Sequence, residues 1–378
     1  MTLDESVRSA LPWIVGGFGA AALITFLLTP FVRRLAVAAD AVDRPNHRRV
    51  NVNPTARGGG LAVAAGFLAV ACAVAIPGLA AAGVRLPPAL NGGQLAILLA
   101  GSGLAAAIGT LDDVYDLRAR WQLLGQLAVA ALVVVAGISV VAIDNPFGPG
   151  RIQLEGAFGV AFTIVWIIGV INSINFIDGL DGLSSGIGVI AAITLGILSL
   201  TASPAQPFVA LLCFALAGSL VGFLRWNFHP ASIFAGTSGV MFVGFTLAVL
   251  AILGTAKVAV ALLVLGVPII DTFWIIVRRM AAGRSPFTPD RGHIHHRLLD
   301  LGLSQRQTVL LIYGICAGLG ALSLILSTAG QVYAFLGVLI GFGLLLFALT
   351  RGQFAAAALE PHSYESSEYE EAADETQE

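Results

Sequence analysis

The sequence predicts an all-α, polytopic membrane protein with about eleven transmembrane helices, on three observations. Of the 378 residues, 57% are hydrophobic and only 11% are charged, whereas soluble domains carry roughly 25% charged residues. Apolar runs recur from Leu11 to Leu349, many of them near the roughly 20 residues that a helix needs to cross a bilayer. Only short polar segments interrupt these runs, so we expect one integral membrane domain over residues 1–350.

The apolar runs define eleven candidate spans, and the basic residues give their orientation. The spans are 11–31, 59–79, 92–111, 121–142, 157–176, 184–202, 206–224, 234–254, 257–277, 307–327 and 332–350. Placing the N-terminus outside puts sixteen of the 20 Lys and Arg residues on the inside, as the positive-inside rule requires. The C-terminus is then cytosolic.

The end of the chain differs in composition from the rest. Eight of the 22 acidic residues lie in the last nineteen positions. With little apolar surface to bury, segment 351–378 is predicted to be a disordered acidic tail. The formal net charge is -2, and we expect membrane lipid but no nucleic acid among the partners.

Three carboxylates close the third predicted span, in Asp112-Asp113-Val-Tyr-Asp116. On a continuous helix Asp112 and Asp116 share one face, with Asp113 beside them. Carboxylates this close repel one another unless a cation or substrate neutralises them, and Mg²⁺ with a diphosphate suits such oxygen ligands. The simpler interpretation is a solvated helix end paired with Arg118 and Arg120.

A second polar cluster interrupts the apolar sequence over residues 172–183. It contains Asn172, Asn175, Asp178 and Asp181, and a glycine follows each of the two Asp residues. Polar groups at a membrane boundary are unfavourable unless they line a wet cavity or contact a partner, and glycines let a ligand approach the backbone. A turn whose Asp caps the next helix is the alternative.

The longest inside loop carries three imidazoles and two guanidinium groups in a short run. The run is Asp290-Arg291-Gly-His293-Ile-His295-His296-Arg297. Such a cationic cluster suits phosphate or a nucleotide. A zinc site lacks further ligands in the sequence, and a basic loop on the membrane surface is the alternative without function.

Two further features are weaker candidates. Arg57 precedes Gly58-Gly59-Gly60, which gives a basic, glycine-rich start to the second span. Asp271 lies inside a predicted span, close to Pro268, and is expected to face the interior of the helix bundle.

Together these motifs resemble the polyprenyl-phosphate N-acetylhexosamine-1-phosphate transferase family, of the glycosyltransferase family 4 type. The chain is most similar to the branch that uses UDP-N-acetylglucosamine. The matching segments are 43–46, 112–116, 175–183, 225–230, 268–272 and 289–298. The resemblance implies about ten or eleven spans and a cytosolic site. It also implies transfer of a sugar-1-phosphate from a UDP-sugar to undecaprenyl or another polyprenyl phosphate, with release of UMP.

The resemblance also implies roles for individual residues. Asp112, Asp113, Asp178 and Asp181 are the catalytic candidates, and Asp112 and Asp113 would hold Mg²⁺, with Mn²⁺ as an alternative. Substrate-binding roles fall to the remaining candidates: Arg57, Asn172, Asn175, His293, His295, His296 and Arg297. A homodimer is compatible with this assignment.

The chain departs from the family pattern where a Gly-Asp-x-Gly-Ser segment is usual. Here it reads Gly236-Thr237-Ser238-Gly239-Val240. Thr237 replaces an Asp that binds Mg²⁺ in the family, and Asn51 stands where His is frequent. Two hypotheses follow: an active transferase with altered metal binding, or a degenerate paralogue that binds polyprenyl phosphate or partner proteins without turnover.

Overall fold

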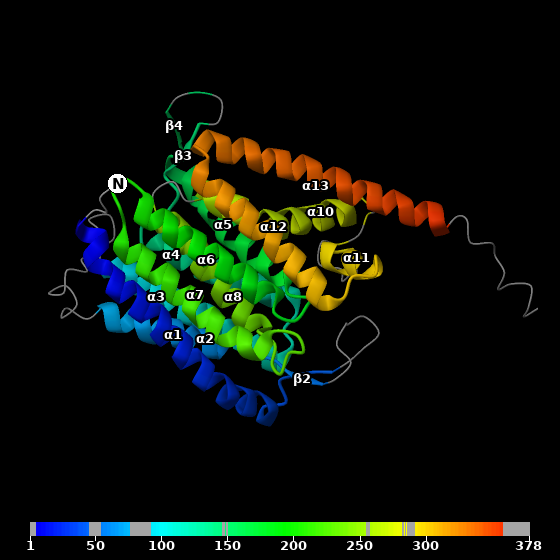
Figure 1. The fold of residues 1–378 in the computed structure, drawn as a ribbon, viewed down its shortest axis with the longest axis horizontal. Helices are drawn as coiled ribbons and strands as arrows, with labels where there is room; N and C mark the ends of the chain where they lie inside the picture. The colour runs from blue at the N-terminus through cyan, green and yellow to red at the C-terminus, as the bar shows by residue number, and fades with distance from the viewer. Residues whose placement is uncertain are drawn as a thin grey trace, which may run out of the picture. The chain divides into compact units, whose positions relative to one another are not determined.

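The structure is a computed structural model, and it is built almost entirely of helices (Figure 1). It describes residues 5–44, 54–75, 92–145, 148, 150–254, 258–281, 283, 285 and 292–357. The helices are α1 (Glu5–Ala38), α2 (Gly60–Ala75), α3 (Gly92–Tyr115), α4 (Ala119–Val135), α5 (Gly156–Ile177), α6 (Leu183–Thr201), α7 (Pro207–Asn227), α8 (Gly236–Leu253), α9 (Val258–Val264), α10 (Gly266–Ala281), α11 (Ile294–Asp300), α12 (Gln305–Ile325) and α13 (Thr328–Ala357).

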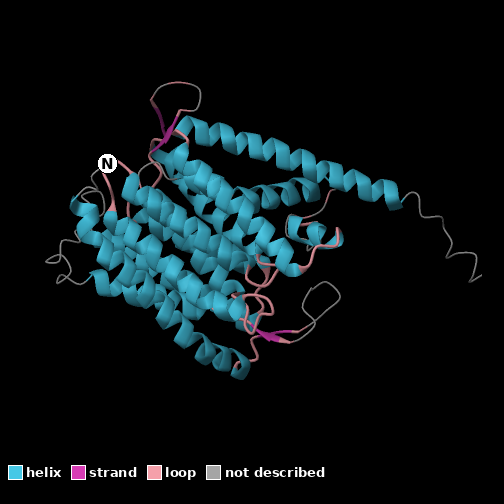
Figure 2. Cartoon of the chain, in the orientation of Figure 1, coloured by secondary structure: helices cyan, strands magenta, loops and turns pink. Residues whose placement is uncertain are grey.

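Two short antiparallel ladders accompany the helices. β1 (Val42–Asp43) pairs with β2 (Thr55–Ala56), and β3 (Ala142–Asp144) pairs with β4 (Arg151–Gln153). Figure 2 shows the ladders at opposite ends of the bundle. The prediction of a helical membrane protein is confirmed, with these small ladders in two of its connections.

Within the described residues, seven helices are long and apolar enough to cross a membrane, or eight if the bent pair α9–α10 forms one span. The seven are α1, α3, α5, α6, α7, α8 and α12. Shorter apolar helices at Gly60–Ala75, Ala119–Val135 and Ala329–Leu344 overlap three more of the predicted segments. The chain is therefore a multi-pass membrane protein.

The segment predicted as one span over 257–277 is not a straight helix. It breaks at Leu265, and α9 and α10 meet at 77°. Pro268 gives the physical reason, because its ring has no N–H to donate to the Val264 carbonyl and would clash with it in a continuous helix. The bend turns α10 away from the direction of α9.

Helix α8 lies at the centre of the bundle and is buried along nearly all its length. Helices α3 and α5 pack against it, while α1 runs beside α7 and α7 beside α6 (Figure 1). Glycines let the neighbouring helices approach the start of α8 closely. A Cβ at Gly60 would overlap the Gly239 backbone, and one at Gly109 would overlap the Ser238 backbone. The start of α8 is thereby held beside the end of α3.

The chain divides into two units, Met1–Phe335 and Leu336–Glu378. The second contains the C-terminal part of α13, whose backbone is helical through Ala357. Most of the predicted acidic tail lies outside the described residues, as do Pro45, Asn46 and Asn51 and the loop residues 286–291.

Candidate active site

Asp112 and Asp113 end α3 as buried carboxylates rather than as a solvated helix end. Asp113 accepts hydrogen bonds from the backbone N–H groups of Thr237, at 2.7 Å, and of Ser238, at 3.0 Å. These N–H groups belong to the first turn of α8, where the helix dipole favours an anion. The pair is therefore bound across the bundle, and its position depends on α8.

Asp112 has three donors. Its Oδ1 accepts from Gln122 Nε2 at 2.8 Å and from the Leu117 N–H at 3.0 Å. Its Oδ2 accepts from the Thr237 hydroxyl. Thr237 thus stabilises the charge on Asp112 by donating a hydrogen bond.

A divalent cation can be tested against these oxygens. A carboxylate offers about four lone-pair positions, and the donors above leave some unused on both Asp112 and Asp113. Within the described part of the chain, no group of three or more acidic, His or Cys side chains is arranged to hold a metal. The two carboxylates would thus hold an ion such as Mg²⁺ only if it takes most of its ligands from water and substrate phosphates.

A cavity of about 970 Å³, here called the central cavity, lies between α4, α5, α9, α10 and the start of α11. Its polar wall carries Asn172, Asn175 and Asp178 from the end of α5, and His293, His295 and His296. Gln122 lines the cavity and also donates to Asp112. The structure thus brings the second and third sequence clusters into one chamber and connects the first cluster to it.

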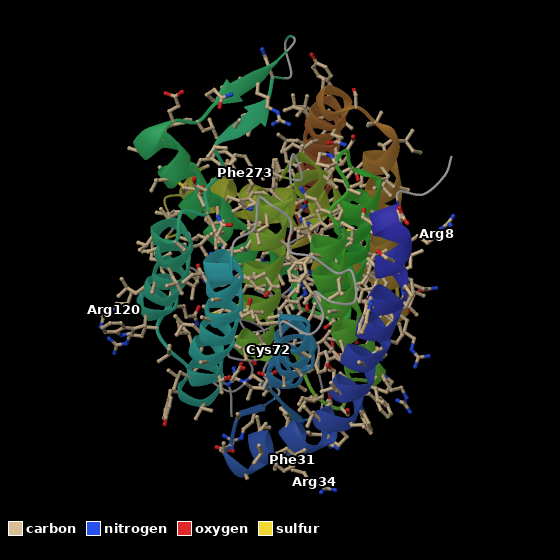
Figure 3. The ribbon with its side chains drawn as sticks, turned by 90° about the vertical axis from the view of Figure 1, so that its left-hand side faces the viewer. Arg8, Phe31, Arg34, Cys72, Arg120 and Phe273 are labelled. Carbon is tan, nitrogen blue, oxygen red and sulfur yellow. The ribbon has the colours of Figure 1, made fainter. Side chains whose placement is uncertain are left out.

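Another part of the lining of the central cavity is apolar. It includes Phe162, Val165, Trp166, Leu262 and Phe273. Val165 and Phe273 are more than half exposed outside the protein's own packing, and Figure 3 shows Phe273 among the side chains of the bundle. One chamber therefore offers both a polar and an apolar environment.

Asp178 follows the last residue of α5 and is half-buried. Ser184 donates a hydrogen bond to its Oδ1 at 2.5 Å. Burial raises the pKa of Asp178 to about 7, with smaller contributions from the charges of Asp113 and Asp181. These contributions show that the first two acidic clusters interact electrostatically.

Asp181 does not line the central cavity. Its Oδ2 lies 2.8 Å from His229 Nδ1 and accepts from the Ala231 N–H at 3.0 Å. It therefore fixes the segment after α7. His229 is not among the sequence candidates, although it lies in the Arg225–Pro230 motif that supports the family resemblance.

The His cluster is organised by Asp271, which is buried in α10 as expected. Asp271 Oδ2 lies 2.7 Å from His293 Nδ1, and Oδ1 accepts from the Ile294 N–H at 2.9 Å. The imidazoles of His293 and His295 stack with ring centroids 5.6 Å apart. One carboxylate thus fixes both the start of α11 and the first imidazole.

His295 is buried, and its Nδ1 atom has no hydrogen-bond partner. Burial lowers the pKa of His295 well below its ordinary value, and the neighbouring His296 and His293 lower it further. The cationic cluster predicted from the sequence therefore contains at least one neutral imidazole, which can bind phosphate as a hydrogen-bond donor but not as a cation.

Arg297 and Arg57 lie beside the cavity rather than in its lining. Arg297 is buried, and its Nε donates to the Gly292 carbonyl at 3.0 Å. The Arg57 guanidinium is 3.8 Å from the exposed carboxylate of Asp116. Arg279, a residue absent from the sequence candidates, does line the cavity, and its guanidinium lies 5.9 Å from the Phe176 ring centroid.

Asn172 forms a pair with Gln126 across the cavity wall. Asn172 Nδ2 donates to Gln126 Oε1 at 2.7 Å. Gln122 and Gln126 were missed by the sequence reasoning, although two Gln residues four positions apart in an otherwise apolar run place both amides on one helical face. That spacing is the signal that could have identified them.

The fold and this cavity define a multi-pass membrane protein with carboxylates, amides and imidazoles gathered beside an apolar chamber. The family model described as Glycosyl transferase family 4 matches residues 95–255. The chain is 38% identical over 354 residues to the decaprenyl-phosphate N-acetylglucosaminephosphotransferase of Mycolicibacterium smegmatis, covering 85% of this chain and 84% of that protein.

Two further relatives have similar names. A probable undecaprenyl-phosphate N-acetylglucosaminyl 1-phosphate transferase of Bacillus subtilis is 35% identical over 306 residues, with 79% of this chain and 81% of the relative covered. An undecaprenyl-phosphate alpha-N-acetylglucosaminyl 1-phosphate transferase of Yersinia pestis is 30% identical over 291 residues, covering 74% and 75%. This chain belongs to glycosyl transferase family 4, and the predicted resemblance is confirmed.

Proposed function

We propose that the protein transfers N-acetylglucosamine-1-phosphate from UDP-N-acetylglucosamine to undecaprenyl or another polyprenyl phosphate. The products are UMP and a lipid-linked diphosphate sugar, the first intermediate of a cell-envelope glycan. The observation that carries the proposal is the central cavity, whose polar wall suits a nucleotide diphosphate and whose apolar wall suits a lipid. The names of the relatives support the same substrates.

The reaction forms one phosphoanhydride bond and breaks another. An oxygen of the polyprenyl phosphate attacks the phosphorus that carries the sugar. The bond from this phosphorus to the bridging oxygen breaks, and that oxygen leaves with UMP. Such a transfer mainly requires the reactants to be positioned and their charge to be stabilised.

The proposed residue roles follow from the positions around the cavity. Asp112 orients or deprotonates the acceptor phosphate, because Gln122 connects it to the chamber. Asn175 and Asp178 hold the uridine and diphosphate of the donor from the end of α5. His293, His295 and His296 bind the donor's phosphates or sugar from the same polar part of the lining. Asn172 is held in the polar part of the lining by its hydrogen bond to Gln126.

Mg²⁺, or Mn²⁺ in its place, would be held by Asp112 and Asp113 together with substrate phosphates. When bound, it would supply the positive charge that stabilises the diphosphate during transfer. Thr237 supports Asp112 in this arrangement through its hydroxyl group. Asp113 keeps its place through the two N–H groups of α8.

The proposed topology has eleven spans, with the N-terminus outside and the site facing the cytosol of a bacterial inner membrane. The excess of inside arginines supports this orientation. α2, α4 and the last apolar helix would then cross the membrane in addition to the eight longer candidates. A cytosolic site would give direct access to a soluble nucleotide sugar.

A direct assay tests the proposal. Purified protein is incubated with Mg²⁺, polyprenyl phosphate and radiolabelled UDP-N-acetylglucosamine, in parallel with other UDP-sugars, and organic-extractable label is measured. We expect label from UDP-N-acetylglucosamine that Asp178→Asn strongly reduces. Asp40→Asn is the matched control, because Asp40 is exposed, paired with Arg44 and not part of the cavity lining. No label with any UDP-sugar from folded protein would favour the non-catalytic paralogue.

A further inference from the structure

Helix α1 contains a proline whose missing hydrogen bond is replaced by another helix. Pro30 has no N–H, so the carbonyl of Phe26, four residues earlier, loses its donor within the helix. Trp226 Nε1, at the end of α7, donates to this carbonyl at 3.1 Å. The rings of Phe26 and Trp226 lie 5.5 Å apart. The indole ring is therefore fixed against α1 at the end of the bundle.

A second cavity, of about 310 Å³, adjoins this contact and is here called the arginine groove. It is lined by Thr29, Pro30, Arg33, Arg34, Val37, Trp226 and Ser232. None of these residues is part of the central cavity lining. The arginine groove is therefore separate from the proposed active site.

The groove is cationic. Arg33 and Arg34 are exposed, and neither has an acidic partner or hydrogen bond among the residues that the structure describes. Arg225 adds a third guanidinium, 5.7 Å from the Trp226 ring centroid. Guanidinium groups next to a fixed Trp at a helix end are typical of the membrane–water interface.

An apolar stripe leads to the groove along α1. Leu23, Leu27, Phe31 and Leu35 recur every four residues, and each is more than half exposed. Their spacing places them on one side of the helix. Figure 3 shows Phe31 and Arg34 together at one end of α1, with Arg8 toward the other end. Apolar surface and guanidinium groups are thus continuous.

We propose that the arginine groove binds the phosphate headgroup of an anionic phospholipid, whose acyl chains lie along the α1 stripe. A phosphodiester supplies a negative charge that balances Arg33 and Arg34, and guanidinium groups bind phosphate well. A second copy of this chain meeting the same face in a twofold contact would instead bring like charges together. The charge pattern therefore favours lipid over self-association.

Native mass spectrometry of purified, delipidated protein tests this site with phosphatidylglycerol and with phosphatidylcholine of the same acyl chains. We expect preferential retention of phosphatidylglycerol. Arg33→Gln/Arg34→Gln should weaken that retention by roughly tenfold or more. The control is Arg118→Gln/Arg120→Gln, which removes the same charge. Arg120 also lies near a Trp ring, 5.4 Å from Trp121, but outside the groove, and this control should retain phosphatidylglycerol.

Several results would overturn the proposal. These are equal retention of the two lipids, equal loss in both double variants, or displacement of the lipid by inorganic phosphate at similar concentration. A change in dimer content with no change in lipid retention would assign the face to a second copy. If Arg33→Gln/Arg34→Gln does not fold, Arg33→Gln and Arg34→Gln are each compared with Arg120→Gln. Polyprenyl phosphate competing equally with phosphatidylglycerol would assign the groove to the acceptor instead.

Discussion

The carboxylate of Asp271 and the imidazole of His293 lie 2.7 Å apart, across the boundary between α10 and the turn before α11. Because a carboxylate only accepts hydrogen bonds, His293 Nδ1 must carry the proton, which leaves Nε2 for the central cavity. Asp271 therefore selects one tautomer of an imidazole in the proposed donor site.

Asp271→Asn tests this relationship. The amide can donate as well as accept, so the tautomer is no longer fixed, and kcat should fall by roughly 10- to 100-fold. If Asp271 acts through His293, the Asp271→Asn/His293→Gln variant should be no slower than His293→Gln alone. If the losses of the two single variants instead add up in the double variant, Asp271 acts independently of His293.

Thr237→Asp should make the protein dependent on a cation for stability. The substitution removes the hydrogen bond to Asp112 and places a third carboxylate beside two others. Without Mg²⁺ we expect a lower Tm for the variant than for the natural protein. Millimolar Mg²⁺ should raise the Tm of the variant by more than it raises the Tm of the natural protein. A higher rate in the Mg²⁺-dependent assay would show that the missing carboxylate limits the natural enzyme. Thr237→Ser should keep the hydroxyl and change little, and a Tm response to Mg²⁺ identical in all three proteins would contradict this model.

Asp178 should make the protein less stable as the pH rises toward neutrality. Its pKa is about 7 in the folded protein and about 4 in an unfolded chain. Ionisation therefore opposes folding increasingly as pH rises from about 4 to about 7. Asp178→Asn should remove this contribution. The difference in Tm between the variant and the natural protein should therefore shift in favour of the variant from pH 5 to pH 8. Thermal unfolding in detergent across this range measures the difference, and parallel curves would refute the assignment.

His295 should contribute a pH dependence of the opposite sign. Its pKa in the folded protein is well below the ordinary value near 6.5, so the unfolded chain takes up a proton first as pH falls. This contribution to stability is present above about pH 6.5 and is lost progressively below it. His295→Gln should therefore lose less Tm between pH 7 and pH 5 than the natural protein. Retention of the full acid sensitivity would assign it to other groups.

Much of the site could be predicted because its chemistry is local in the sequence. Asn172, Asn175 and Asp178 interrupt an apolar run, and helical spacing places them at one end of α5. The family resemblance implied that this cluster and His293 serve one site, and the structure places both in the central cavity.

What sequence could not supply is the pairing between distant segments. Asp181 with His229 and Asp113 with the start of α8 are contacts across 48 and 124 positions. They depend on how glycine contacts between helices set the packing, and periodicity contains no information about that. Likewise, Pro268 was noticed as a feature near Asp271, but its effect, a 77° bend, is a matter of three-dimensional geometry.

The bend between α9 and α10 has a consequence for the size of the acceptor. With α10 turned aside, Phe273 and Val165 form an exposed apolar edge of the central cavity. We therefore expect a long isoprenoid to insert its phosphate end and first units, while the remainder stays dissolved in the surrounding hydrocarbon. Recognition would stop a short way along the tail, so polyprenols differing by several units should be used with similar efficiency.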